Sequence, residues 1–248
     1  MPNGGDHSRS GVSEILPACE DCVLKPVALC GAFLQAAPTD YYGLKRTFRS
    51  VPARRVIVKA GSAADSLMTL KEGWAFSYQF LSDGRRHIHA FYIPGDSIGL
   101  DVDPGVPLAY AVQALTPVQI CTFDNNSFIA RGQKHAEFSR DVRVRDLAYV
   151  RSLEERLIYV SRYPAASRIA WLILSLRQRL DQNARLKGDT MDFPLTQTHV
   201  ADALGLTAAH VNRMFSDMRS ERVVSLERAQ LTILDLDRLT EITREMGT

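Results

Sequence analysis

The stretch that decides the fold of the C-terminal part is LTQTHVADALGLTAAHVNRMFSDMRSER, residues 195–222. Thr196 can cap a helix whose apolar residues return at spacings of three and four. Gly205 then supplies a residue that turns with positive φ at little cost, and Thr207 can cap a second helix. The stretch therefore predicts two short helices joined by a tight turn. The positions expected to face inward are Val200, Ala201, Leu204, Val211, Phe215 and Met218.

The outer face of the second helix carries hydrogen-bonding side chains and little bulk. In a helix-turn-helix such a face lies in the DNA major groove, where Arg can pair with guanine and Asn with adenine. An ordinary helical hairpin inside a core is the alternative. The short glycine turn, the small Ala201 where the helices approach and the polar outer face favour DNA recognition. The candidate DNA-binding residues are Thr207, Ala209, His210, Asn212, Arg213 and Ser216.

Length and composition are those of a globular protein. The 248 residues, 46% of them hydrophobic, can form one large or two modest domains. No apolar run is long enough to span a membrane, and the start MPNGGDHSRSG lacks the apolar core of a signal peptide. We therefore expect a cytoplasmic protein with no membrane partner. A net charge of +2 does not by itself indicate a nucleic-acid binder; only the arrangement does.

Three of the four cysteines lie close together near the start of the chain. In CEDCVLKPVALC, Cys19, Cys22 and Cys30 form a C-x2-C-x7-C array, in a stretch whose Pro26 and lack of a clear period predict a loop. The fourth, Cys121, lies far downstream. In a reducing cytosol thiols rarely form structural disulfides. A four-thiolate iron–sulfur cluster, a zinc site, a redox switch and inert cysteines remain as alternatives.

Short β-rich runs occupy the region from residue 54 to residue 123. They are separated by glycines that recur every 11 or 12 residues. Regular short strands with a turn signal each time indicate a β-sandwich or jelly roll. Cys121 falls in the last of these runs, PVQICTF. The separating glycines are Gly61, Gly73, Gly84 and Gly95.

A helical stretch from about residue 137 to residue 160 carries an apolar seam. The seam residues recur at steps of three and four, whereas charged residues such as Arg145 and Glu154 are free to face water. The seam either packs on the β-rich domain or forms a two-fold dimer interface, the symmetry needed to read a palindromic DNA site. Pro164 ends the helix. The seam residues are Leu147, Val150, Leu153, Leu157 and Val160.

The C-terminal part has the pattern of a winged helix. The run AASRIAWLILSLRQRL predicts a helix before the helix-turn-helix, and VVSL and LTIL after it can pair as a β-hairpin. We therefore expect an α+β chain of four parts. These are a flexible tail and cysteine loop (1–30), a β-roll or jelly-roll sensor domain (31–135), a dimerisation helix (136–161) and a winged helix-turn-helix domain (162–248).

The order β-roll, long helix, winged helix, with the motifs RIAWLILSL, LTQTHVADALGLT and VVSLERAQLTIL, resembles the cyclic-AMP-receptor/FNR family of bacterial transcription regulators. The resemblance runs from about Cys19 to the end. Within it, Cys19, Cys22, Cys30 and Cys121 are similar to the oxygen-sensing FNR branch, in which four such cysteines hold a [4Fe–4S] cluster. The segment GDSIGLDVDPGVPLAYAVQAL lacks the Arg-Ser/Thr-Ala phosphate cassette of the nucleotide-binding branch. No cyclic nucleotide is therefore expected.

Two features depart from the FNR branch. Its recognition helix reads E-x-x-S-R, whereas the matching positions here are Ala209, Asn212 and Arg213, so the guanine-reading arginine is retained and the glutamate is absent. Where that branch has an acidic residue that weakens dimerisation without the cluster, this chain has Leu153. These departures predict a less strictly read half-site and a firmer cluster-free dimer.

The resemblance implies a homodimer that is not an enzyme, binds palindromic promoter DNA, works with RNA polymerase and responds to oxygen or redox state through the cluster. If the cluster favours the DNA-binding arrangement by a certain free energy, its loss would weaken DNA binding by that same free energy. Two other functions stay open. One is a family member without a cluster that senses redox state through thiols or binds a small ligand. The other is an iron–sulfur electron-transfer protein, in which the helix-turn-helix would have no role.

Overall fold

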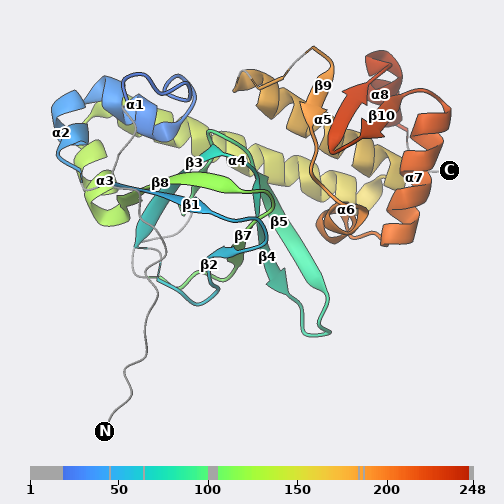
Figure 1. Ribbon diagram of the computed structural model, residues 1–248, viewed down its shortest axis with the longest axis horizontal. Helices are drawn as coiled ribbons and strands as arrows, with labels where there is room; N and C mark the ends of the chain where they lie inside the picture. Colours follow the sequence, from blue (N-terminus) through green and yellow to red (C-terminus); the bar gives the residue numbers. More distant parts are fainter. Residues whose placement is uncertain are drawn as a thin grey trace, which may run out of the picture.

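The computed structural model describes residues 19–44, 46–63, 65–99, 106–183, 185–186 and 188–245. The predicted flexible tail, residues 1–18, lies outside this part of the chain. A β-rich lobe and a helical lobe lie side by side, and the long helix α4 (Ala136–Arg162) extends from one to the other (Figure 1). With 27 residues, α4 is about 40 Å long. No helix among the described residues is both long and apolar enough to cross a membrane.

The β-rich lobe is a roll of two antiparallel four-stranded sheets, which confirms the predicted sensor fold. One sheet has the order β1-β8-β3-β6, comprising Arg46–Val51, Val118–Asp124, Ser66–Glu72 and Ser97–Ile98. The other has the order β2-β7-β4-β5, comprising Val56–Val58, Ala111–Ala114, Ala75–Phe80 and Arg86–Tyr92. The strand β5 therefore lies at a sheet edge. Leu70, Val112 and Ile120 are fully buried between the sheets.

Three short helices close one end of the roll. They are α1 (Leu29–Ala36), α2 (Pro38–Tyr42) and α3 (Asn125–Gly132), and α1 also packs against α4. Phe33 of α1 is fully buried, with its ring centroid 5.1 Å from that of Phe128 and 4.8 Å from that of Phe138. This aromatic cluster joins the N-terminal helix to the roll and to the first turn of α4.

Cys30 lies in the first turn of α1, so the prediction of a loop was wrong at this residue. The helix forms because Leu29, Phe33 and Leu34 are buried on one side at helical spacing. Gly31 allows the close approach of the preceding segment, since a Cβ there would overlap the Lys25 backbone. Residues 19–28 form successive turns anchored by the buried Leu24 and Ala28.

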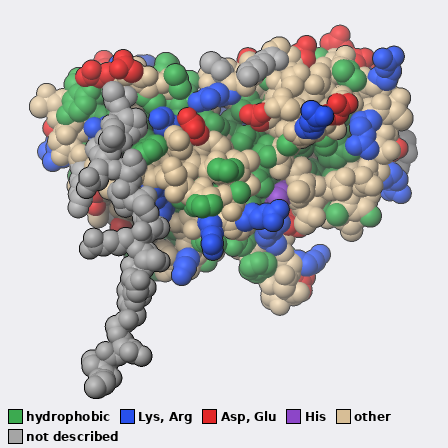
Figure 2. Space-filling model, viewed as in Figure 1, with side chains coloured by type: hydrophobic (Ala, Val, Ile, Leu, Met, Phe, Trp, Pro, Cys, Tyr) green, Lys and Arg blue, Asp and Glu red, His purple; other side chains and the backbone are tan. Residues whose placement is uncertain are grey.

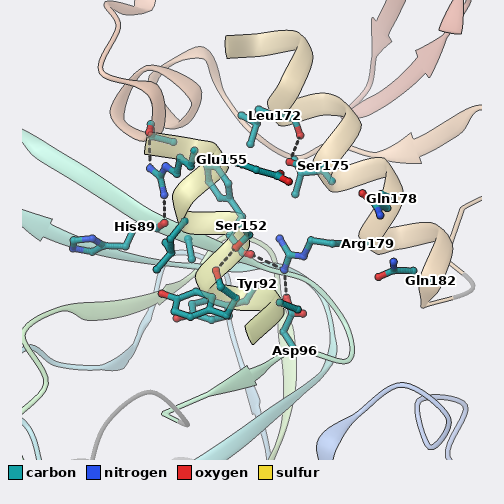
Figure 3. Close-up of a pocket in the computed structure, with 18 of the residues that line it drawn as sticks. His89, Tyr92, Asp96, Ser152, Glu155, Leu172, Ser175, Gln178, Arg179 and Gln182 are labelled. Atoms are coloured by element: carbon teal, nitrogen blue, oxygen red, sulfur yellow. Dashed lines mark hydrogen bonds and ion pairs between the residues drawn. The ribbon is translucent and has the colours of Figure 1, made fainter. Parts of the chain in front are cut away.

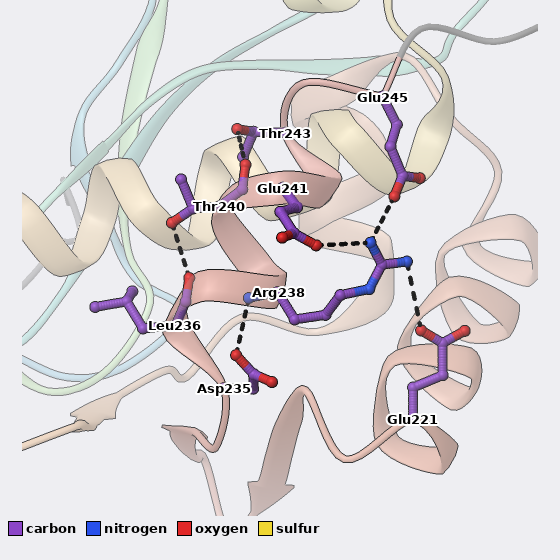
Figure 4. A network of polar contacts seen from close by, with 8 residues as sticks. All are labelled: Glu221, Asp235, Leu236, Arg238, Thr240, Glu241, Thr243 and Glu245. Atoms are coloured by element: carbon purple, nitrogen blue, oxygen red, sulfur yellow. Dashed lines mark hydrogen bonds and ion pairs between the residues drawn. The ribbon is translucent and has the colours of Figure 1, made fainter.

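The helical lobe is a winged helix. It contains α5 (Ala165–Gln182), α6 (Gln197–Leu204), α7 (Ala208–Ser220) and the wing hairpin of β10 (Val224–Glu227) and β11 (Gln230–Ile233), as predicted. The sequence did not reveal β9 (Thr190–Asp192), which adds a third strand, or α8 (Leu236–Ile242). Arg238 of α8 lies among Glu221, Glu241 and Glu245 and ties α8 to the end of α7 (Figure 4).

Candidate DNA-reading surface and cysteine site

Local hydrogen bonds shape the two helices of the predicted helix-turn-helix. The Thr196 hydroxyl accepts from the His199 backbone N–H at 3.2 Å, and the His199 ring accepts from the Thr196 N–H at 3.2 Å. Gly205 ends α6 with φ 67°. The Thr207 hydroxyl accepts from the His210 N–H at 3.2 Å and so begins α7. All six predicted inward positions are buried, which confirms the two-helix unit.

The outer face of α7 is open to solvent. Arg213 is exposed and forms no hydrogen bond or ion pair within the described part of the chain. The Asn212 carbonyl oxygen accepts from the side-chain amide of Gln197 at 2.9 Å, a partner on α6 that sequence reasoning missed. The Asn212 NH₂ group can therefore donate a hydrogen bond to a DNA base. Among the candidate residues His210 is half-buried, and the exposed ones are Thr207, Ala209, Asn212, Arg213 and Ser216.

Charge is mixed over the face of the molecule seen in Figure 2, where basic and acidic side chains alternate over both lobes. This agrees with the net charge of +2. A strong field of one sign would bind any nucleic acid, whereas a mixed surface leaves recognition to particular side chains. The free Arg213 guanidinium therefore carries the geometric argument for base reading.

Cys19, Cys30 and Cys121 lie at the end of the roll covered by α1, and Cys22 lies in the turn that follows Cys19. Cys121 on β8 lies directly opposite Thr69 on β3, and the Cys30 thiol hydrogen-bonds to the Thr69 side chain. The Cys19 sulfur accepts from the Tyr41 hydroxyl at 3.3 Å and from the Arg46 guanidinium. Cys19, Cys30 and Cys121 pack against the aromatic cluster around α1, and all four cysteines are free thiols.

Burial raises the pKa of Cys30 to about 11 and that of Cys121 to about 12. The nearby Cys19 and Cys22 raise both pKa values further, which places the four sulfurs within electrostatic reach of one another. The two buried thiols are therefore protonated at neutral pH. A positively charged group that binds to them must displace these protons, because thiolate is the ligand form.

Four thiolates are the ligand set of a [4Fe–4S] cluster, and zinc accepts the same ligands. Within the described ranges, no three His, Cys, Asp or Glu side chains lie close enough together to hold one metal ion. A four-iron cluster places its own atoms between the cysteines and takes four thiolates. Arg46 beside Cys19 supplies a positive charge that offsets the negative charge of the thiolates that would hold such a group.

The predicted seam of α4 does not pack on the β-roll. Leu147, Val150, Leu153 and Leu157 are 41–70% exposed, so that alternative was wrong for these four residues. Val160 is half-buried close to Gly205, at the turn of the helix-turn-helix. An apolar stripe of this length open to water requires a partner surface.

The face of α4 beside the seam carries two arginines that sequence analysis did not place correctly. Arg145 was expected to face water, but its guanidinium donates to the Val27 carbonyl, in the cysteine loop, at 2.8 Å. Arg156 was not singled out, and it donates to backbone carbonyls of β5 and α6. Both are missed for one reason: the acceptors are backbone carbonyls, which leave no signal in a sequence.

A winged helix-turn-helix after a β-roll and a long helix defines a DNA-binding transcription regulator. Residues 167–242 match the Crp-like helix-turn-helix domain, and residues 48–135 match the cyclic nucleotide-binding domain. The chain belongs to the Crp/FNR family of transcription regulators, which are not enzymes. The second match defines the sensor fold; the expectation of no cyclic nucleotide stays a prediction, and residues 100–105 of its segment lie outside the described residues.

Relatives span nearly the whole chain. Transcriptional activatory protein AadR of Rhodopseudomonas palustris is 28% identical, over 88% of this chain and 90% of its own. Transcriptional activator protein FnrL of Cereibacter sphaeroides is 28% identical, over 93% of each chain. The Anaerobic regulatory protein of Haemophilus influenzae is 22% identical, over 91% of this chain and 87% of its own. The structure of FixK2 from Bradyrhizobium japonicum matches with a TM-score of 0.72 and 24% identity, covering 80% of this chain and 98% of that one.

Proposed function

We propose that the protein is a dimeric transcription activator whose affinity for palindromic promoter DNA responds to oxygen through a [4Fe–4S] cluster held by Cys19, Cys22, Cys30 and Cys121. The observation that carries the proposal is that Cys19 and Cys30, from the N-terminal segment, and Cys121, from β8, pack against the same aromatic cluster, with Cys22 in the turn that follows Cys19. The names of FnrL and of the Haemophilus influenzae relative support activation and a response to anaerobic conditions. Such a protein acts on DNA in the cytoplasm and contacts RNA polymerase.

The chain's own residues provide the physical route from the cysteines to the DNA. When bound, the cluster would supply an oxygen-labile group that fixes the cysteine loop. That loop contacts α4 through the hydrogen bond from Arg145 to the Val27 carbonyl. The helix α1 also contacts α4, through the rings of Phe33 on α1 and Phe138 on α4. Any displacement of the loop therefore acts on α4, the helix that carries the exposed seam. Through linkage, an arrangement favoured by one ligand raises the affinity for the other.

The exposed seam supports the proposed dimer. Two copies of α4 related by a two-fold axis would bury Leu147, Val150, Leu153 and Leu157 against their symmetry mates. The same axis would present two recognition helices about 34 Å apart, the length of one turn of DNA. Leu153 at the centre of the seam favours association in either state of the cysteines.

The test is to replace the cysteines by serine one at a time and to measure iron, acid-labile sulfide and DNA binding without oxygen. We expect about four irons per chain in the wild type and a loss of most of the iron in each variant. Val23→Ala, in the same loop and exposed, is the matched control and should keep its iron. Full iron and activity in all four serine variants would contradict the proposal.

A bare-thiol redox regulator is the second candidate, favoured by one contact. Arg46 and Tyr41 both donate hydrogen bonds to the Cys19 sulfur, which sets Cys19 apart from the other three cysteines. In that case only Cys19→Ser should change the redox response, and the anaerobic protein should contain no iron. The pattern across the four serine variants separates the two candidates.

A further inference from the structure

Arg156 lies at the point where the sensor, the long helix and the DNA-binding domain meet. Its guanidinium donates to the carbonyls of Ile88 at 2.6 Å and of His89, both on β5. It also donates to the carbonyl of Ala203, on α6, at 2.5 Å. One side chain of α4 thus holds the backbone of the β-roll and the backbone of the first helix of the helix-turn-helix.

The three carbonyls are available because of the local backbone. The strand β5 is an edge strand, so one side of its backbone has no strand partner. A β-bulge leaves His89 without a cross-strand partner, since Ser77 pairs with Ala90 and Tyr78 with Ile88. Bulges reorient the backbone locally and are enriched beside functional sites. Ala203 lies in the last turn of α6, where helix carbonyls lack intrahelical partners.

An arginine suits this junction better than a lysine. Burial lowers the pKa of Arg156, but a guanidinium stays protonated and offers five donors in a fixed plane. That planar fork can reach acceptors on two different elements at once. A lysine ammonium is a compact charge and cannot reproduce the same spread of donors.

Other direct contacts join the two lobes, some of them near Arg156 and others along α5. Arg86 of β5 pairs with Asp202 of α6 at 2.8 Å, and the His199 ring lies 5.2 Å from the Phe76 ring. β5, α4 and α5 line a groove of about 690 Å³, and Arg156 and its three acceptor residues belong to this lining. Figure 3 shows this groove, with Ser152 and Glu155 on α4, Ser175 and Gln178 on α5, and the Arg179–Asp96 pair spanning it. Within this set of contacts, Arg156 is the side chain that joins α4 directly to α6 by a hydrogen bond.

We propose that Arg156 is a positioning residue that fixes the helix-turn-helix relative to the dimerisation helix, and thereby sets the separation of the two recognition helices in the dimer. In the proposed dimer α4 defines the two-fold axis, and Arg156 joins α4 to α6, which packs directly on α7. This inference rests on the proposed dimer but not on the cluster. Arg156 acts on DNA spacing and does not touch a base.

The test measures binding to palindromes whose central spacer is lengthened or shortened by one base pair. The protein is the full-length chain in its DNA-binding form, and the variants are Arg156→Met and, as the matched control, Arg151→Met on the exposed side of the same helix. We expect wild type and control to discriminate strongly between spacers. In Arg156→Met the ratio of affinities between spacers should fall by about tenfold or more, because the loss of one hydrogen bond to a charged group changes an equilibrium by about that factor. Its base preference within a half-site should not change.

Two further readouts separate positioning from simple destabilisation. A destabilised protein binds all spacers more weakly in the same proportion, so the ratio between spacers stays constant. Arg156→Lys, which keeps the charge, should recover part of the discrimination. Sedimentation checks that each variant is a dimer, which separates a failure of dimerisation from a failure of the Arg156 role. Unchanged spacer discrimination in folded, dimeric Arg156→Met would overturn the inference.

Discussion

Truncating Phe33 tests whether the aromatic cluster joins the cysteine helix to the rest of the sensor. The ring is 0% exposed and contacts the rings of Phe128 and Phe138 at 5.1 and 4.8 Å. Phe33→Ala should lower the free energy of unfolding of the sensor by about 3–5 kcal/mol, which includes the lost ring–ring contacts. Phe33→Leu keeps most of the apolar volume and should lower it by less than about 1.5 kcal/mol.

The assay is urea unfolding of the metal-free protein in a Trp171→Phe background, so that the remaining tryptophan, Trp74, reports unfolding. Trp74 is buried in the β-roll, whereas Trp171 lies on α5. Val23→Ala is the control, because a residue that is 73% exposed should change stability by no more than about 0.5 kcal/mol. If Phe33→Ala unfolds at the same urea concentration as Val23→Ala, the aromatic cluster does not hold α1 and the reasoning is refuted.

Three other predictions concern the dimer, the base contact and pH. Leu153→Asp should make the cluster-free protein monomeric, because like charges would face each other across the interface; a wild type that sediments wholly as monomer at micromolar concentration contradicts this. Arg213→Ala should weaken binding to a palindrome by about 2–6 kcal/mol, with no such loss on DNA carrying 7-deazaguanine; an equal loss on both DNAs places Arg213 away from the base. Burial and Arg86 lower the pKa of His199, so its neutral ring stabilises the fold fully above about pH 6.5 and this contribution is lost as the pH falls further. As the pH is lowered beneath about 6.5, the melting temperature should therefore fall, and it should fall less in His199→Gln. Equal falls in the two proteins would contradict the role given to the neutral His199 ring.

The helix-turn-helix could be predicted almost residue by residue because its signals are local. Thr196, Gly205 and Thr207 act within a few residues along the chain, and each takes the role its chemistry predicts. The wing followed from alternating apolar residues, but β9 was missed because three residues, Thr190–Asp192, are too few to show a period. Local chemistry therefore explains why this part was predicted best.

The inner face of α4 was predicted least well. Periodicity separates an apolar stripe from a polar one, but it cannot show that a polar residue such as Arg145 or Arg156 meets backbone carbonyls of another element. Those acceptors arise from the edge position of β5, the bulge at His89 and the end of α6. Such features exist only once the lobes are packed. The four cysteines, by contrast, could be grouped from their spacing and from resemblance before their contacts with Thr69 and Arg46 were known.

The most direct test of the central proposal is a stepwise oxygen titration of the anaerobically purified protein. Visible absorption reports the cluster, and fluorescence anisotropy with a labelled palindrome reports DNA binding in the same sample. We predict about four irons per chain at the start and a loss of high-affinity binding that follows the loss of absorption. An iron-free protein, or DNA affinity that stays constant while the absorption is bleached, would contradict the account.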